Sequence, residues 1–381
     1  MGTGMRRATI ADVAREAGVS TSTASVVFSG KVNVADATRE KVLAAAAALG
    51  YTGPDPRAAS LRTGRSGIVG VVLAGELRHA FLDPVTTVMM DGLTDALASI
   101  STGILLLRDD PRDDEPPAIA EAPVDAVVLI GCSARAGELL EVVRQRGLPV
   151  VVIEGEAGIE VPQVTLDNRE ASAALSRHVF QLGHRRVATI TLPVDSARER
   201  VPLTPEREAV ATVSVTLDRL AGFREVFPEA VAITAGGSLV DEGYLVARML
   251  LAADDGAPRD DRPTAIVAQS DLLAVGAIRA AEELGLRVPD DLTVVGFDGI
   301  AADGLGSLEL TTMAQPALEK GRAAGEQVAR MLEGEPGESV HFSCEFRAGE
   351  TAAVPNEQDS PVEFRAGETA AVPNEQDSPV E

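Results

Sequence analysis

The sequence predicts an α/β protein preceded by a small helical domain, because two sequence patterns divide the chain. From residue 68 onward, short continuous runs of Val, Ile and Leu alternate with stretches of helical periodicity. Such runs are typical of parallel strands buried on both faces by helices. Residues 1–65 lack them and carry nine Lys or Arg against five Asp or Glu, although the net charge of the chain is −24. A basic N-terminal domain therefore precedes an acidic body, and phosphate contact is expected only at the N-terminus.

Residues 8–30 predict two short helices joined by a tight turn. Thr9 and Asp12 have the spacing of a capping box, and Gly18 is suited to end the first helix. Ser20 can cap the second helix, which has its own apolar face around Val27 and short polar side chains on the outer face. This is the spacing of a helix-turn-helix that reads the major groove of DNA. A helical hairpin inside a larger core is the alternative.

The remaining elements follow in order along the chain. A third helix is expected after Asp36, and residues 52–67, which contain Pro, Gly and Arg, form a linker. Strands are expected at 68–73, 104–107, 126–130, 149–153, 187–191, 231–234, 265–268 and 292–297. Helices are expected at 85–100, 137–147, 168–182, 218–227, 240–253 and 272–285. Two Rossmann-like lobes result, and the cleft between them is the default place for a small molecule.

Several other classes of protein lack support in the sequence. The four histidines show no HExxH spacing, and neither a GxSxG nor a P-loop is present. Cys132 and Cys344 are not in a metal or redox spacing. We therefore expect no enzyme activity, cofactor or metal. The N-terminus has no secretory signal and no segment has 18 uninterrupted apolar residues, so a cytoplasmic protein without membrane contact is expected.

A series of motifs makes the chain similar to a known family. In order they are IADVAREAGVSTSTAS, EKVLAAAAALGY, SLRTGRSGIVG, VTLDNREA, LGHRRVATI, RLAGF, GLRVPDDLTVVGFD and LTTMAQP. From about Thr9 to Thr351 the chain resembles the lactose-repressor/galactose-repressor (LacI/GalR) family of bacterial transcriptional regulators. The resemblance implies a helix-turn-helix head, a hinge helix ordered by DNA, and a two-lobed effector core like that of periplasmic binding proteins for sugars. It also implies a homodimer that binds double-stranded operator DNA and a small-molecule effector.

This interpretation divides the chain into five parts. Residues 1–53 form the head and 54–66 the hinge. The first lobe takes residues 67–183 and 316–342, and the second takes 184–315 and 343–354. Residues 355–381 are expected to be a disordered tail, because residues 345–362 are repeated without change at 363–380. The first copy is expected to supply a terminal strand, while the second is more easily explained by a recent duplication than by function.

The resemblance implies contacts to DNA at specific positions. Base contacts are expected from Thr21, Ser22 and Val26, and a minor-groove wedge from Leu61. Phosphate contacts are expected from Thr9, Ser20, Thr23, Ser25, Asn33 and Thr38. Val26 departs from the family, which often has Arg there, and valine offers only apolar contact, for instance to a thymine methyl. The operator is therefore predicted to differ at that base pair. For the Ser and Thr residues, capping and solvation are the alternative.

The resemblance also places an effector site in the core. Its expected residues are Phe81, Asp167, Arg219, Ser270, Asp298 and Gln315. A guanidinium and a carboxylate that converge at strand ends can hold hydroxyl or acidic groups. Alternatively, Arg219 forms a surface ion pair with Asp218 or Glu225, and Asp298 caps a helix. A sugar is the favoured effector and a nucleobase the alternative. A solute-binding protein without gene control would lack the basic head. A sugar- or nucleoside-acting enzyme would need a catalytic cluster.

Overall fold

The computed structural model describes residues 8–29, 34–53, 64–74, 77–109, 116–131, 136–253, 261–300 and 308–356. The first of these form the head, which contains helices α1 (Ile10–Ala17), α2 (Thr21–Ser29) and α3 (Asp36–Ala48). The predicted capping box is present, because the Thr9 hydroxyl accepts from the Asp12 amide and the Asp12 carboxylate accepts from the Thr9 amide. Gly18 ends α1 with a φ of +67°, a conformation that glycine adopts without strain. The predicted start and end of the first helix are therefore confirmed.

Three helices enclose a small apolar core in the head. Val13, Ala24 and Val42 are fully buried there, one from each helix. The rings of Phe28 and Tyr51 meet edge to face at 5.2 Å and close one side of this core. The packing leaves the outer face of α2 to short polar side chains.

The first lobe is a parallel sheet covered by helices on both faces. Its strand order is β11-β5-β4-β3-β1-β2. The strands are β1 (Ile68–Ala74), β2 (Gly103–Asp109), β3 (Ala126–Ile130), β4 (Val150–Ile153), β5 (Gln163–Leu166) and β11 (Val340–Phe342). Its helices are α5 (Leu77–Leu82), α6 (Pro84–Ala98), the short 3-10 helix η1 (Ala118–Ala120), α7 (Ala136–Gln145) and α13 (Ala317–Leu332). β3 is buried throughout and β4 is buried from Val151 onward, and both runs are those that the sequence pattern predicts.

The second lobe repeats this arrangement with one antiparallel edge. Its strand order is β12-β10-β9-β8-β6-β7, and only β12 runs antiparallel to its neighbour among the strand pairs described. The strands are β6 (Val187–Thr191), β7 (Val231–Thr234), β8 (Ala265–Ala268), β9 (Thr293–Asp298), β10 (Thr311–Ala314) and β12 (Glu345–Arg347). Its helices are α8 (Asn168–Gln181), α9 (Pro205–Glu208), α10 (Ser214–Arg224), α11 (Val240–Leu251) and α12 (Asp271–Glu283).

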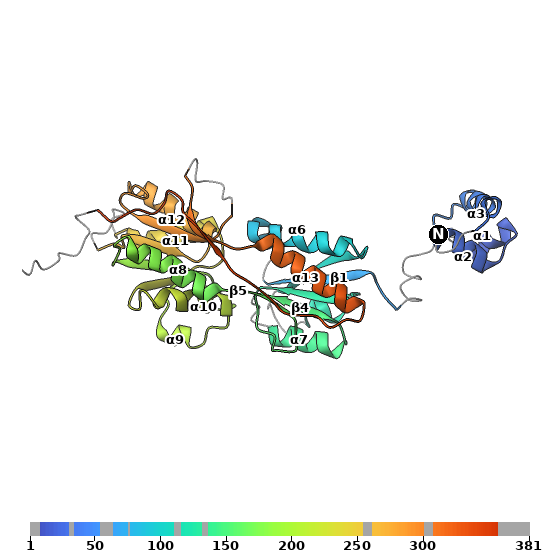
Figure 1. Cartoon of the computed structure of the whole chain (residues 1–381), viewed down its shortest axis with the longest axis horizontal. Coiled ribbons are helices and arrows are strands. Elements are labelled where there is room, and N and C mark those ends of the chain that lie inside the picture. Colours follow the sequence, from blue (N-terminus) through green and yellow to red (C-terminus); the bar gives the residue numbers. More distant parts are fainter. Residues whose placement is uncertain are drawn as a thin grey trace, which may run out of the picture.

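The chain passes between the lobes after β5, after β10 and after β11, and Figure 1 shows the lobes end to end. Helix α8 requires a correction, because residues up to 183 were expected in the first lobe. Its apolar side chains, including Leu175 and Val179, pack in the core of the second lobe with Phe223. The first crossover is therefore at Asp167, where the periodicity of strands and helices gives no signal of a change of sheet.

The C-terminal segment also differs in part from expectation. The first copy of the repeat supplies the terminal strand β12, as predicted. Pro355 and Asn356, expected in the disordered tail, lie in the described structure, and the Asn356 side chain donates to the Asp290 carbonyl at 2.8 Å. Residues 357–381 lie outside the described residues. No helix among the described residues is long and apolar enough to cross a membrane.

Candidate functional site

The second helix of the head presents a row of small polar side chains. Ser20 accepts from the Thr23 amide at 3.1 Å and so caps α2, as predicted, and its hydroxyl also lies 2.8 Å from that of Ser22. Ser20, Thr21 and Ser22 are exposed, whereas Thr23, Ser25 and Val26 are half-buried on the same helix. These side chains are short enough to let a helix backbone enter a major groove. The capping role of Ser20 and a contact to phosphate are compatible, because a hydroxyl can both donate and accept.

The remaining predicted DNA contacts are distributed over the head and the linker. Thr9 is exposed at the start of α1, and Thr38 is half-buried in the first turn of α3. Asn33 and Leu61 lie outside the described residues, as does most of the linker. Contacts to DNA from all of these positions stay predictions.

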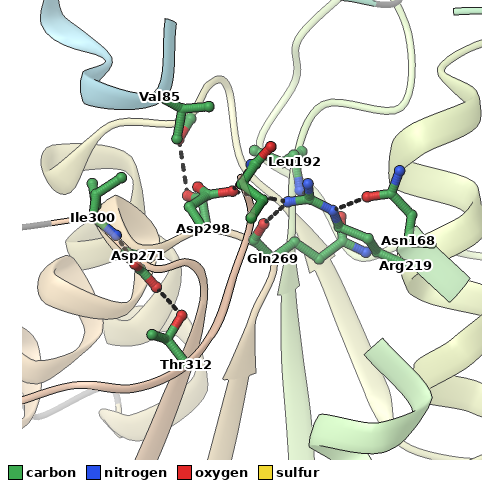
Figure 2. Close-up of polar contacts among 12 residues, drawn as sticks. Val85, Asn168, Leu192, Arg219, Gln269, Asp271, Asp298, Ile300 and Thr312 are labelled. Carbon is green, nitrogen blue, oxygen red and sulfur yellow. Dashed lines mark hydrogen bonds and ion pairs between the residues drawn. The ribbon is translucent and has the colours of Figure 1, made fainter. Parts of the chain in front are cut away.

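In the core, Arg219 is the centre of the candidate effector site. It lies on α10 and is only 3% exposed. Its Nε donates to the Asn168 side-chain oxygen at 2.8 Å, and a terminal nitrogen donates to the Gln269 carbonyl at 2.5 Å. The guanidinium lies over the Phe297 ring, 3.7 Å from its centroid. Figure 2 shows the guanidinium held between Asn168 and Gln269. This burial does not fit the surface ion pair considered as its alternative role, and Glu225 pairs with Arg169 instead.

Asp298 lies at the end of β9, beside this guanidinium. One of its carboxylate oxygens is 3.5 Å from Arg219 and accepts from the Gln315 amide at 2.6 Å. The backbone φ of Asp298 is +123°, a region that non-glycine residues rarely occupy. Strain of this kind persists where the surroundings hold a residue firmly, and it is common at binding sites.

Burial raises the pKa of Asp298 to about 8. The guanidinium of Arg219 acts in the opposite direction, while the carboxylates of Asp271 and Asp83 raise the pKa further. Burial likewise raises the pKa of Asp271 to about 7, although its two oxygens accept from the Thr312 hydroxyl and the Ile300 amide. The strand ends of the second lobe therefore hold carboxyl groups that are partly protonated near neutral pH.

Four more polar side chains connect Arg219 and Asp298 into a closed ring of six that joins the two lobes. Gln315 accepts from the Lys320 ammonium, which forms an ion pair with Glu154 at 3.3 Å. Glu154 accepts from Asn168 at 3.3 Å, and Asn168 accepts from Arg219. We call this set the interlobe ring, and its members are Glu154, Asn168, Arg219, Asp298, Gln315 and Lys320.

The position of each ring member explains why the ring spans the lobes. Glu154 and Lys320 belong to the first lobe, and Arg219 and Asp298 to the second. Asn168 and Gln315 stand at two of the crossovers, where a change in lobe angle must be absorbed. A rotation of one lobe against the other would therefore stretch or break these hydrogen bonds.

The other predicted effector residues have different surroundings. Asp167 accepts from the Cys344 amide at 2.8 Å and ties two crossovers together. Ser270 caps α12 by accepting from the Leu273 amide, and its hydroxyl accepts from Ser238 at 2.9 Å. Phe81 is 67% exposed, so its ring is not part of the buried network. Among the predicted residues, the structure brings together Arg219, Asp298 and Gln315.

Sequence reasoning missed Glu154, Asn168, Gln269 and Lys320. Lys320 could have been found from the sequence pattern, because it lies between Ala317 and Ala324 on one face of α13. The structure shows that this face is buried and that Lys320 is 1% exposed. A lysine on an apolar helix face requires a buried partner. The sequence signal of Glu154 is weaker, since it is only that a charged residue follows the apolar run of β4 directly. No described group of His, Cys, Asp and Glu side chains is arranged to hold a metal ion.

A helix-turn-helix head joined to a two-lobed core with a polar centre is the architecture of a DNA-binding regulator with an effector-binding core. Comparison with known proteins agrees with this. Residues 9–53 match the description "Bacterial regulatory proteins, lacI family", and residues 176–350 match "Periplasmic binding protein-like domain". The HTH-type transcriptional regulator Rv3575c of Mycobacterium tuberculosis is 35% identical over 332 residues, which cover 84% of this chain and 90% of the relative. The chain belongs to the LacI family of bacterial transcriptional regulators.

Two solved structures extend the likeness to the whole fold. The transcriptional regulator CelR in complex with cellobiose is 25% identical, with a TM-score of 0.59 over 91% of this chain and 100% of that one. The lac repressor dimer bound to operator and the anti-inducer ONPF is 20% identical, with a TM-score of 0.70 over 91% of this chain and 100% of that one. The second likeness shows the fold alone. Both bear out the expected head and two-lobed core, and the relatives are regulators rather than enzymes.

Proposed function

We propose that this protein is a repressor whose affinity for its operator is controlled by a small molecule bound between the lobes. The observation that carries the proposal is the interlobe ring, because it is polar, four of its six members are buried, and it is placed at the crossovers. A ligand that contacts Arg219 and Asp298 must alter the hydrogen bonds that fix the lobe angle. Such a ligand shifts the equilibrium only by the difference in its affinity for the two lobe arrangements.

A polyhydroxylated ligand, such as a sugar, suits this chemistry best. Arg219 donates, Asp298 accepts or donates according to its protonation, and Asn168 and Gln315 do both. Sugar hydroxyls also both donate and accept, so they can replace bonds within the ring. The cellobiose complex of the related CelR supports a sugar. The absence of Trp means that any stacking surface must come from another side chain.

On DNA, the protein acts as a homodimer that places one head in each half-site of an operator. The outer face of α2 reads base edges, and Leu61 enters the minor groove at the centre. The proposal is supported by the form of the lac repressor dimer, whose fold this chain shares. A change in lobe angle is passed to the hinge helices because the first lobe begins where the linker ends.

The test is the variant Arg219→Ala. We expect it to bind operator DNA with nearly unchanged affinity and to lose the response to effector, because the head is separate from the buried guanidinium. The effector is first found by a thermal-shift screen of sugars and nucleobases with the wild-type protein. Operator binding is then measured by fluorescence anisotropy across an effector titration. A variant that still releases DNA at the wild-type effector concentration would refute the role given to Arg219.

A further inference from the structure

The C-terminal repeat puts two identical segments in one chain, while the structure describes one binding place for them. Residues 345–362 and 363–380 have the same 18-residue sequence. Residues 345–356 of the first copy lie along the edge of the second sheet, where β12 pairs with β10. We call the surface that receives them the C-terminal slot, and it is formed by β10, the start of β9 and the loop at His184.

Specific contacts hold the first copy in the C-terminal slot. Thr351 is fully buried; its carbonyl accepts from the Val294 amide at 2.9 Å and its hydroxyl from the Thr311 amide at 3.0 Å. The amide of Ala353 donates to the Thr293 hydroxyl at 3.1 Å, and its carbonyl lies 2.8 Å from the His184 ring.

Gly349 fits closely against the same edge. A Cβ at this position would lie 2.3 Å from the carbonyl oxygen of Glu309, which is a backbone atom and cannot move aside easily. The slot therefore selects a sequence with Gly and Thr two residues apart. The second copy supplies the same pair as Gly367 and Thr369.

We propose that residues 363–374 can replace residues 345–356, and that they occupy the C-terminal slot of their own chain whenever the first copy leaves it. We call this the reserve arrangement. Every contact described above depends on residue types that the second copy repeats. The difference between the two arrangements is a loop of 18 residues between Cys344 and Glu363. Closing a loop of that length disfavours the second copy by on the order of 10²-fold.

The tether to the first copy favours exchange within one chain over exchange between separate molecules. A segment tethered by a short flexible linker acts at an effective concentration of about millimolar. The corresponding segment of a molecule outside the proposed homodimer is present only at the protein concentration. The reserve arrangement is therefore a minor state of the wild-type protein and the major state once the first copy is damaged.

The test compares three full-length variants. The first damages the first copy by Gly349→Val with Thr351→Asp, which adds a backbone clash and buries a carboxylate. Its matched control makes the same changes in the second copy, Gly367→Val with Thr369→Asp, and the third variant carries both pairs. We expect the unfolding constant in urea to rise about 10²-fold in the first variant, to stay unchanged in the control and to rise at least a further tenfold in the third.

Hydrogen exchange with mass spectrometry identifies the occupant, because the substitutions make the two copies different in mass. We expect amide protection to move from 345–356 to 363–374 in the first variant, which stays in the same oligomeric state as the wild type. Equal instability of the first and third variants, with no protection of the second copy, would overturn the proposal. Transfer of protection only in a newly formed oligomer would overturn the claim that the exchange occurs within one chain.

A fourth protein covers the case in which the damaged first copy stays in place. Residues 345–356 are replaced by an alternating Gly and Ser sequence of the same length, which cannot supply Phe346 or Thr351. Protection at 363–374 in this protein supports the proposal. An unprotected second copy in this protein would overturn it.

Discussion

At the residue scale, the candidate effector site depends on charges that are buried but balanced. Arg219 has an aromatic ring on one face and three oxygen acceptors around its edge. One of these acceptors is the Asp298 carboxylate, which has few other contacts that stabilise its negative charge. Removal of one partner of a buried ion pair commonly costs more than the pair contributes, because the other charge is left unpaired.

The raised pKa of Asp298 predicts a pH dependence of stability. Between pH 4 and pH 8 the folded protein holds a proton on this carboxyl that the unfolded chain releases. The free energy of unfolding therefore falls as pH rises through this range, by on the order of 1 kcal/mol per pH unit, and the fall ends above about pH 8. We expect Asp298→Asn to lack this contribution, measured as the wild-type minus variant difference in urea unfolding from pH 5 to 9. Asp241→Asn, at an exposed position of α11, is the control, and a difference for Asp298→Asn that does not change with pH would contradict the assignment.

Val26 predicts a change in operator preference. A valine on the outer part of α2 can touch a thymine methyl but cannot make the paired hydrogen bonds that Arg makes to guanine. We expect Val26→Arg to shift the preferred base pair toward G·C, with a discrimination of about 1–3 kcal/mol. The measurement is selection from a randomised operator library, with exposed Glu16→Gln on α1 as the control. Unchanged preference in Val26→Arg would sink the assignment of this position to a base contact.

At the element scale, glycines set how closely helices approach. In the first lobe, α6 and α13 cross with Gly92 and Gly321 at the contact. A Cβ on Gly321 would lie 1.8 Å from the Met89 carbonyl oxygen, and one on Gly92 would lie 2.0 Å from the Leu318 carbonyl oxygen. This crossing holds α13 near β4, and α13 carries Lys320. The packing of two helices therefore positions one member of the interlobe ring.

This crossing predicts a strong effect of a single methyl group. We expect Gly321→Ala to lower the free energy of unfolding by about 1–3 kcal/mol, because the helices must move apart. Gly137→Ala in α7 is the matched control, since nothing lies within 4 Å of its Cβ position. It should be neutral or stabilise by up to about 1 kcal/mol through helix propensity. Urea denaturation measures both, and equal effects would show that the crossing does not depend on the glycine.

At the scale of the whole molecule, the two lobes are coupled through a few side chains at the crossovers. The buried ion pair of Lys320 and Glu154 lies in the first lobe, and Gln315 connects it to Asp298 in the second. The ring therefore links the position of one lobe to that of the other through hydrogen bonds. This coupling is local to the crossovers, while each lobe keeps its own apolar core.

The coupling predicts that Lys320 affects effector response without contact to DNA. We expect Lys320→Met to change the effector concentration for half-release of operator by at least about tenfold, because the ring is opened between the lobes. Operator affinity without effector is the internal reference, and Glu319→Gln, at an exposed position of the same helix, is the control. Anisotropy titrations that give the same half-release concentration for wild type and Lys320→Met would contradict the role of the ring.

Local patterns in the sequence determined most of the fold of this protein. Apolar runs located β3, β4, β6, β7 and β8, and caps located α1 and α2, because strand burial and helix ends depend on neighbouring residues. The sequence did not predict the short strands β5, β10 and β11, since polar residues interrupt them and they form no continuous apolar run. The exposed edge strand β12 was expected, but its pairing with β10 required the structure.

The sequence by itself thus determined the basic head, the parallel strands and the residues Arg219 and Asp298 as a candidate pair. Only the tertiary structure decided that α8 belongs to the second lobe and that Glu154, Asn168 and Lys320 complete a ring with that pair. The physical reason is distance along the chain. Glu154 and Lys320 are 3.3 Å apart in space but lie on segments that the chain joins only after crossing to the other lobe and back. No local pattern encodes such a contact, because it is created when the strands and helices of both lobes have packed.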